Sequence, residues 1–182
     1  MLESFFYLLT VFFILAIFGT MAIAGFRGAP WVPTKKKDLD RLINLADIHE
    51  GDTIFELGSG DGRIIFEIAK RYKVSAIGVE ISLLPYVYSK VKLWLMNTIF
   101  VHRLKGKVRI VYRDMFEQNL ESADVVICFL LPRSISELEN KFNKELKNGA
   151  KMISYVFPLE SRSATETNKP EKSSIAIYMY RF

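Results

Sequence analysis

Residues 53–62 read TIFELGSGDG, an apolar run followed by a turn that holds three glycines within five residues. The run Thr53–Leu57 is typical of a short buried strand, because it is apolar and bounded by turn-forming residues. The helix-like segment Arg63–Tyr72 follows directly. A strand, a glycine turn and a helix in this order predict an α/β fold whose ligand binds at the turn, beyond the carboxyl end of the strand.

The same alternation of strands and helices continues along the chain. Further strands are expected at 74–80, 107–112, 123–130, 151–157 and 174–182. Helices are expected at 38–46, 83–104 and 134–146, with a polar loop at 161–173. This order predicts one domain built on a doubly wound, mostly parallel sheet with helices on both faces.

The N-terminal segment Ser4–Phe26 contains 23 residues and no charged side chain. As a helix it would be about 34 Å long, enough to cross a hydrocarbon core of roughly 30 Å. A helix that is apolar on every side is buried in protein or in lipid. We therefore expect one transmembrane helix within residues 1–27. A secretory signal peptide, with Ala22-Ile23-Ala24 as its cleavage site, and a buried core helix are the alternatives.

Charges flank this segment unevenly. Only Glu3 precedes it, whereas Arg27, Lys35–Lys37 and Arg41 follow it. Because cytoplasmic flanks carry the excess of Lys and Arg, the N-terminus is expected outside and the remaining chain in the cytoplasm.

Composition excludes several classes of site. Cys128 is the single cysteine, so no intramolecular disulfide forms, and it reads as a small core residue. With two histidines in the chain, no cluster of metal ligands is indicated. The net charge is +5, but Lys and Arg are scattered among acids without the aromatic interleaving of nucleic-acid interfaces. We therefore expect neither a metal site nor a nucleic-acid partner.

The spacing of the glycine turn separates two classes of cofactor. A dinucleotide fingerprint has glycines at its first, third and sixth positions, but here Arg63 occupies the sixth and the third glycine comes one residue early. Pyrophosphate binding at the helix start is therefore less favoured. Glu56, two residues before the first glycine, instead suits a cofactor with a cationic amino-acid end.

Two more acids end neighbouring strands. Glu80 ends the second strand, where a carboxylate can accept both ribose hydroxyls. Asp114 follows the third strand, where it can meet an adenine amino group, with Met115 and Phe116 beside the ring. The plainer alternative is an ordinary turn and solvated strand ends.

At these residues the sequence resembles the class I S-adenosylmethionine-dependent methyltransferases. ELGSGDG resembles their first motif, GVEIS their second and RDM their adenine-contacting segment. The order of apolar segment, WVPT, GDTIFELGSGDGRI, GVEIS and FPL is similar to one group in particular. This group is the membrane-anchored protein-lysine methyltransferases that modify the c subunit of ATP synthase and the adenine nucleotide translocase, together with prokaryotic relatives.

The resemblance implies the Rossmann-like class I methyltransferase fold and S-adenosylmethionine as the cofactor. It divides the chain into an anchor at 1–27, a linker or lid at 28–37 and a methyltransferase domain at 38–182. The residues it implies for cofactor binding lie at four strand ends. They are Glu56, Leu57, Gly58, Ser59, Gly60, Asp61, Gly62, Glu80, Ile81, Asp114, Met115 and Phe129.

The resemblance also implies a substrate side. The segment Trp31, Val32, Pro33 and Thr34 would close over the site. Phe129, Leu130, Leu131 and Pro132 stand where many amine methyltransferases carry an Asn- or Asp-Pro-Pro-aromatic motif.

The missing amide or acid fits an amine acceptor that desolvation deprotonates. No catalytic base is assigned. Tyr86, Tyr88 and Tyr155 are candidates, with aromatic core packing as the favoured interpretation of all three.

These observations favour a protein-lysine N-methyltransferase that acts on a membrane-associated protein. The alternatives are a methyltransferase for lipids or quinones at the membrane, a non-catalytic membrane adaptor, and an enzyme that uses NAD or a nucleotide sugar.

Overall fold

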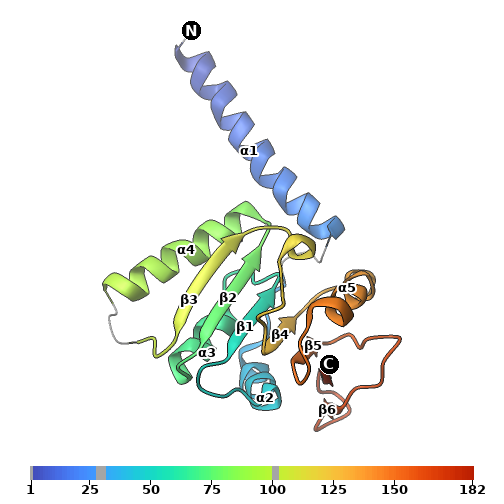
Figure 1. The fold of residues 1–182 in the computed structure, drawn as a ribbon. Coiled ribbons are helices and arrows are strands. Elements are labelled where there is room, and N and C mark those ends of the chain that lie inside the picture. Colours follow the sequence, from blue (N-terminus) through green and yellow to red (C-terminus); the bar gives the residue numbers. More distant parts are fainter. Residues whose placement is uncertain (1, 28–31, 100–102) are drawn as a thin grey trace.

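The computed structural model describes residues 2–27, 32–99 and 103–182 (Figure 1). Trp31 lies outside these ranges. The helices are α1 (Leu2–Arg27), α2 (Lys36–Ala46), α3 (Arg63–Arg71), α4 (Leu83–Thr98), the short 3-10 helix η1 (Met115–Glu117) and α5 (Pro132–Glu145). The strands are β1 (Thr53–Leu57), β2 (Ser75–Glu80), β3 (Lys107–Tyr112), β4 (Val125–Cys128), β5 (Lys151–Tyr155), β6 (Glu166–Asn168) and β7 (Ile177–Arg181).

The described strands form one sheet in the order β3-β2-β1-β4-β5-β7-β6. Strands β1 to β5 are parallel, whereas β7 is antiparallel to both β5 and β6. The predicted mostly parallel α/β sheet is confirmed. The strand order reverses between β1 and β4, and ligands of such sheets bind beyond the carboxyl ends of the strands at this reversal.

Helices cover both faces of the sheet because successive side chains of each strand point to opposite sides. Ile54 of β1 packs in one core with Leu42 of α2 and Ile65 of α3. Its neighbour Phe55 packs in the other core with Leu138 of α5. The site at the end of β1 is thus supported by packed layers above and below.

The apolar N-terminal segment forms helix α1, which projects away from the sheet (Figure 1). Large apolar side chains along it, such as Phe5 and Leu15, are exposed. Within the ranges that the structure describes, no helix combines the length and apolar character that a membrane span requires. The predicted transmembrane helix is therefore not supported.

Several predicted boundaries differ from those of the structure; the strand expected at 123–130, for example, is limited to Val125–Cys128. The helix expected at 83–104 ends at Thr98. The segment expected as a loop at 161–173 contains β6, which pairs with β7, so two strands and not one follow Pro158. The β6 sequence Glu-Thr-Asn is polar, and its backbone pairing at the sheet edge makes it a strand.

Candidate functional site

The glycine turn connects β1 to α3 at the reversal of strand order. Gly58, Gly60 and Gly62 have φ values of 74°, 54° and 70°, a left-handed backbone that glycine adopts at little cost. The amides of Gly58 and Ser59 donate to the carbonyl of Val79 at 2.9 and 3.0 Å, which ties the turn to β2. A Cβ at Gly58 would lie 3.2 Å from Leu130, so bare backbone here faces the segment after β4.

Glu80 ends β2 and is buried beside this turn. Its carboxylate accepts hydrogen bonds from the amide of Gly60 at 2.7 Å and from the amide of Ser82 at 2.6 Å. Each carboxylate oxygen has two lone pairs, so further hydroxyl donors can still be accepted. Glu80 thus joins the glycine turn to the start of α4.

Glu56 lies in β1 directly before the turn and is buried. It accepts a hydrogen bond from the amide of Ile65 at 3.3 Å. Burial raises the pKa of the Glu56 carboxyl well above its usual value, and the nearby carboxylates of Asp61 and Glu80 raise it further. A cation beside these carboxylates would lower the pKa of Glu56 again, because it favours the charged form of the carboxyl.

Asp114 follows β3 and caps η1 by accepting a hydrogen bond from the amide of Phe116 at 3.0 Å. Met115 beside it is buried. The amide of Arg113 donates to the carbonyl of Glu80 at 3.1 Å, so the Asp114 segment adjoins the end of β2. The structure therefore brings together the acids that the sequence places at three successive strand ends.

An apolar wall follows β4 on the other side of the turn and consists of Phe129, Leu130 and Leu131. Leu130 is buried, whereas Leu131 and Pro132 are exposed at the start of α5. The Phe129 ring packs edge-on against Tyr155 with a centroid separation of 4.8 Å.

Arg63, the first residue of α3, connects the glycine turn to the segment before α2. Its Nε and Nη2 atoms donate to the two carboxylate oxygens of Asp61 at 3.0 and 2.8 Å. Its Nη1 atom donates to the carbonyl of Thr34 at 2.9 Å, and Thr34 is buried whereas Val32 and Pro33 are exposed. Burial raises the pKa of Asp61, but the hydrogen bond and charge of Arg63 outweigh it, so the pKa of Asp61 is lowered.

Arg63 stands at the sixth position of the turn, but the spacing of the turn alone predicts no role for it. Lys92 was also missed: its Nζ atom lies 3.4 Å from the carbonyl of Asp61 and 4.6 Å from the centre of the Phe66 ring. Burial lowers the pKa of Lys92. Nothing in the α4 sequence marks this lysine, since its contact depends on how α4 packs against α3.

The three tyrosines differ. Tyr155 is buried and its hydroxyl donates to Asp38 at 2.7 Å. Burial raises the pKa of Tyr155, and the Asp38 carboxylate raises it further, so this hydroxyl is held protonated. Tyr86 packs on Tyr112 at 5.2 Å between ring centroids. Core packing is the wrong interpretation for Tyr88, which is 60% exposed on α4.

Cys128 is buried in β4, where desolvation raises the pKa of its thiol. Among the described side chains, no group of three or more His, Cys, Asp or Glu residues is arranged to hold a metal ion. The groups present at the turn are carboxylates, which accept hydrogen bonds, backbone amides, which donate them, and glycine backbone without side chains. This set fits a sulfonium nucleoside, because carboxylates can accept its hydroxyl and amino hydrogens and offset its positive charge.

Comparison with known proteins supports this chemistry. Residues 56–166 match the profile of the family described as ANTKMT methyltransferase domain. A protein-lysine N-methyltransferase of Saccharolobus islandicus (strain REY15A) is 34% identical over 154 residues, which cover 83% of this chain and 92% of that protein. A human lysine N-methyltransferase, named for the C subunit of ATP synthase, is 28% identical over 129 residues, which cover 71% of this chain and 52% of the human protein. The chain thus spans about half the length of that human relative.

A solved structure extends the likeness to the fold. The crystal structure of an RNA methyltransferase from Salinibacter ruber in complex with S-adenosyl-L-homocysteine is similar with a TM-score of 0.73 and 29% sequence identity. The match covers 82% of this chain and 93% of that chain.

Proposed function

Since this chain belongs to the family of the ANTKMT methyltransferase domain, we propose that it transfers methyl groups from S-adenosylmethionine to lysine side chains of proteins. The resemblance to class I methyltransferases is confirmed, and so are the α/β methyltransferase fold and S-adenosylmethionine as the cofactor. Lysine as the acceptor is supported by the names of the relatives from Saccharolobus islandicus and human.

The observation that carries the proposal is the set of buried carboxylates around bare glycine backbone. When bound, S-adenosylmethionine supplies a methyl group on a positively charged sulfur. Glu56 would face the cationic amino-acid end of the cofactor. Glu80, which already accepts a hydrogen bond from Gly60 of the turn, would face the ribose hydroxyls. Asp114 and Met115 would hold the adenine.

The acceptor side would be the apolar wall of Phe129, Leu130 and Leu131. A lysine amine must lose its proton before it can attack, and desolvation at an apolar entrance lowers its pKa. Tyr155 does not suit the role of base, because its hydroxyl already donates to Asp38. Positioning of amine and methyl group in line supplies roughly 7–11 kcal/mol of the barrier reduction in such reactions.

RNA is the second candidate acceptor, since the solved structure from Salinibacter ruber is named an RNA methyltransferase. Lipids and quinones are the third candidate class of acceptor, since the sequence is also compatible with a methyltransferase that acts on them at the membrane. A non-catalytic adaptor fits less well, because the acids and glycines of the pocket are all present.

The test is to incubate the purified full-length chain with S-adenosylmethionine labelled in its methyl group and with a cell lysate that includes membranes. Protein, RNA and organic-solvent extracts are then counted separately. We expect label in protein that protease releases and ribonuclease does not. Label confined to the RNA or to the organic extract would overturn lysine as the acceptor.

A membrane-associated acceptor and a location at the cytoplasmic side of a membrane are also part of this proposal. The human relative supports them, since its name refers to a component of ATP synthase. The Lys and Arg residues that follow α1 support them as well, because positive charge is attracted to the anionic lipids of the cytoplasmic leaflet. Fractionation of cells that produce the chain, followed by protease treatment of intact membrane vesicles, tests the location.

A further inference from the structure

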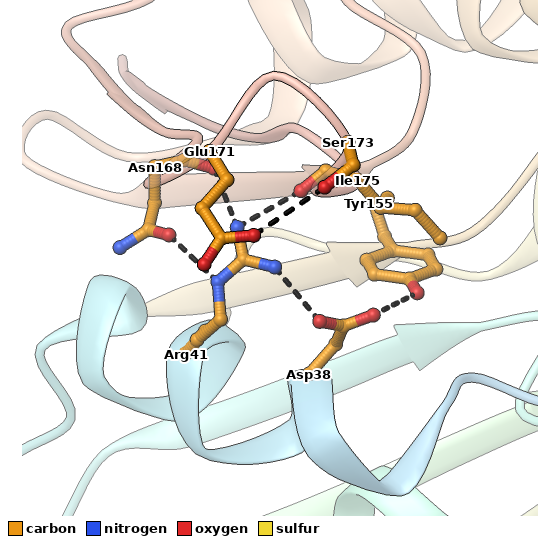
Figure 2. A network of polar contacts seen from close by, with 7 residues as sticks. All are labelled: Asp38, Arg41, Tyr155, Asn168, Glu171, Ser173 and Ile175. Carbon is orange, nitrogen blue, oxygen red and sulfur yellow. Dashed lines mark hydrogen bonds and ion pairs between the residues drawn. The ribbon is translucent and has the colours of Figure 1, made fainter.

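A buried hydrogen bond joins the start of α2 to the end of β5 (Figure 2). The hydroxyl of Tyr155 donates to the carboxylate of Asp38 at 2.7 Å, across 117 residues of sequence. Asp38 is 2% exposed and Tyr155 is 1% exposed. A bond between a hydroxyl and a carboxylate is among the stronger ones in proteins, and burial protects it from water.

Arg41 extends this contact to β6 and to the residues that precede β7 (Figure 2). Its Nη1 atom lies 2.7 Å from the Asp38 carboxylate. Its Nε atom donates to the side chain of Asn168 at 2.9 Å, and Nη2 donates to the carbonyls of Asn168 and Ile175, both at 2.9 Å. Asp38 therefore has two firm partners, and its position relative to β5, β6 and β7 is fixed.

The turn that follows Tyr155 is strained. Val156 has a φ of 82°, a left-handed backbone that is an outlier for a β-branched residue. Its amide donates to the carbonyl of Ala176 at 3.0 Å, and the Ser154 hydroxyl donates to the carbonyl of Phe157. Strain of this kind persists only where the surroundings enforce it, and it is often found at functional sites. The ring of Tyr155, directly before this turn, packs against Phe129 on the acceptor side of the site.

The segment before α2 is also bound at Thr34 to a residue beside the glycine turn. The carbonyl of Thr34 accepts from Arg63, which also holds Asp61 of the glycine turn. The amide of Asp38 donates to the carbonyl of Lys35 at 2.9 Å, so the segment between the two contacts is short and ordered. Thr34 to Asp38 thus bridges the cofactor turn and the Tyr155–Phe129 wall.

We propose that Asp38 and Tyr155 are positioning residues whose hydrogen bond holds the Thr34–Asp38 segment against the Tyr155–Phe129 wall and so fixes the entrance for the acceptor amine. The proposal rests on the proposed function of the same site and assigns its substrate side. Neither residue touches the reacting atoms. Their effect is on how the acceptor is placed after the cofactor has bound.

The test compares Tyr155→Phe with Tyr180→Phe in the full-length chain. Tyr180 is fully buried as well, and its hydroxyl accepts from the amide of Leu159 at 2.8 Å, so each variant loses one buried hydrogen bond. For Tyr155→Phe we expect kcat for methyl transfer, measured with the protein fraction of a cell lysate as the acceptor, to fall on the order of 10-fold. The Kd for S-adenosylhomocysteine should stay within about twofold of wild type. Tyr180→Phe should keep kcat within about twofold. Equal losses of kcat in both variants, or no loss in Tyr155→Phe, would overturn the proposal.

A conservative pair tests Asp38 in the same way. Asp38→Asn keeps an oxygen that accepts from Tyr155, whereas Asp38→Ala removes it. We expect Asp38→Asn to retain more of the wild-type kcat than Asp38→Ala does. Equal kcat values in the two variants would contradict a positioning role for this contact.

Hydrogen–deuterium exchange provides a readout that needs no acceptor. The amides of residues 34–38 should exchange on the order of 10-fold faster in Tyr155→Phe than in wild type, and unchanged in Tyr180→Phe. Unchanged exchange in Tyr155→Phe would refute the proposed contact even if lysine methylation is found. If the wild-type chain methylates no protein, the proposed function fails while this result still stands.

Discussion

The carboxylate of Glu80 accepts a hydrogen bond of 2.7 Å from the amide of Gly60, a residue 20 positions earlier in the chain. The acid that suits a ribose and the turn that suits the amino-acid end of the cofactor are therefore one connected unit. A substitution at either residue should therefore alter the position of the other.

Glu80→Gln should weaken the affinity for S-adenosylhomocysteine by about 10-fold, because charge-assisted bonds to the ribose become neutral ones. Glu80→Ala should also lower the melting temperature, since it leaves the buried amides of Gly60 and Ser82 without their acceptor. Titration calorimetry and thermal melts measure the two effects. An unchanged affinity in both variants would contradict the place of Glu80 in the site.

The stability of the chain should depend on pH through Glu56. Its folded pKa is raised above the usual 4.5, so the folded state binds this proton more tightly than the unfolded state. The stabilisation that this gives is complete below pH 4.5 and is lost as the pH rises through the folded pKa. A glutamine at position 56 does not titrate. As the pH rises above 4.5, the free energy of unfolding of Glu56→Gln should therefore increase relative to that of wild type. Denaturant unfolding at several pH values checks this, and parallel curves for the two proteins would refute it.

Arg63→Ala should loosen the Thr34 segment and the glycine turn together, because one guanidinium holds both. We expect the affinity for S-adenosylhomocysteine to fall on the order of 10-fold. The affinity of Arg63→Lys should be close to that of Arg63→Ala, since an ammonium cannot reproduce the bidentate contact with Asp61. Arg71→Ala is the matched control, since Arg71 lies on the same helix as Arg63 and its loss breaks ion pairs with Asp40 of α2 and Glu67 of α3. Comparable affinity losses in Arg63→Ala and Arg71→Ala would count against a specific role for Arg63.

Gly62→Ala should cost about 1–3 kcal/mol of stability. The added Cβ would combine a φ of 70° with an approach of 2.7 Å to the ring of Phe66. Gly149→Ala has a similar φ of 85° but meets nothing within 4 Å, so only the backbone penalty of about 1 kcal/mol applies. Chemical denaturation measures both. A loss in Gly62→Ala no larger than in Gly149→Ala would show that the turn tolerates a side chain.

The sequence was most informative where structure is local. The run Thr53–Leu57, the glycines after it and the acid at Glu80 predicted β1, the turn and the end of β2, because apolar runs and glycine spacing act within a few residues. The edge strand β6 could not be predicted, since its residues are polar and only pairing with β7 makes them a strand.

Contacts between distant segments were likewise out of reach. Asp38 meets Tyr155 across 117 residues, and Arg41 meets Asn168 across 127. No periodicity or spacing in the sequence relates such pairs. They arise only when α2 packs against the last strands of the sheet.

If the buried carboxylates and the glycine turn present S-adenosylmethionine to a lysine amine, lysine Nζ atoms must receive its methyl group. Tandem mass spectrometry detects this transfer after incubation of the chain and a cell lysate with cofactor that carries a trideuterated methyl group. We expect trideuteromethyl groups on lysine Nζ atoms, at much lower levels when Glu80→Ala replaces the wild-type chain. Deuterated methyl groups found only on nucleotides or lipids, or on no product at all, would contradict this expectation.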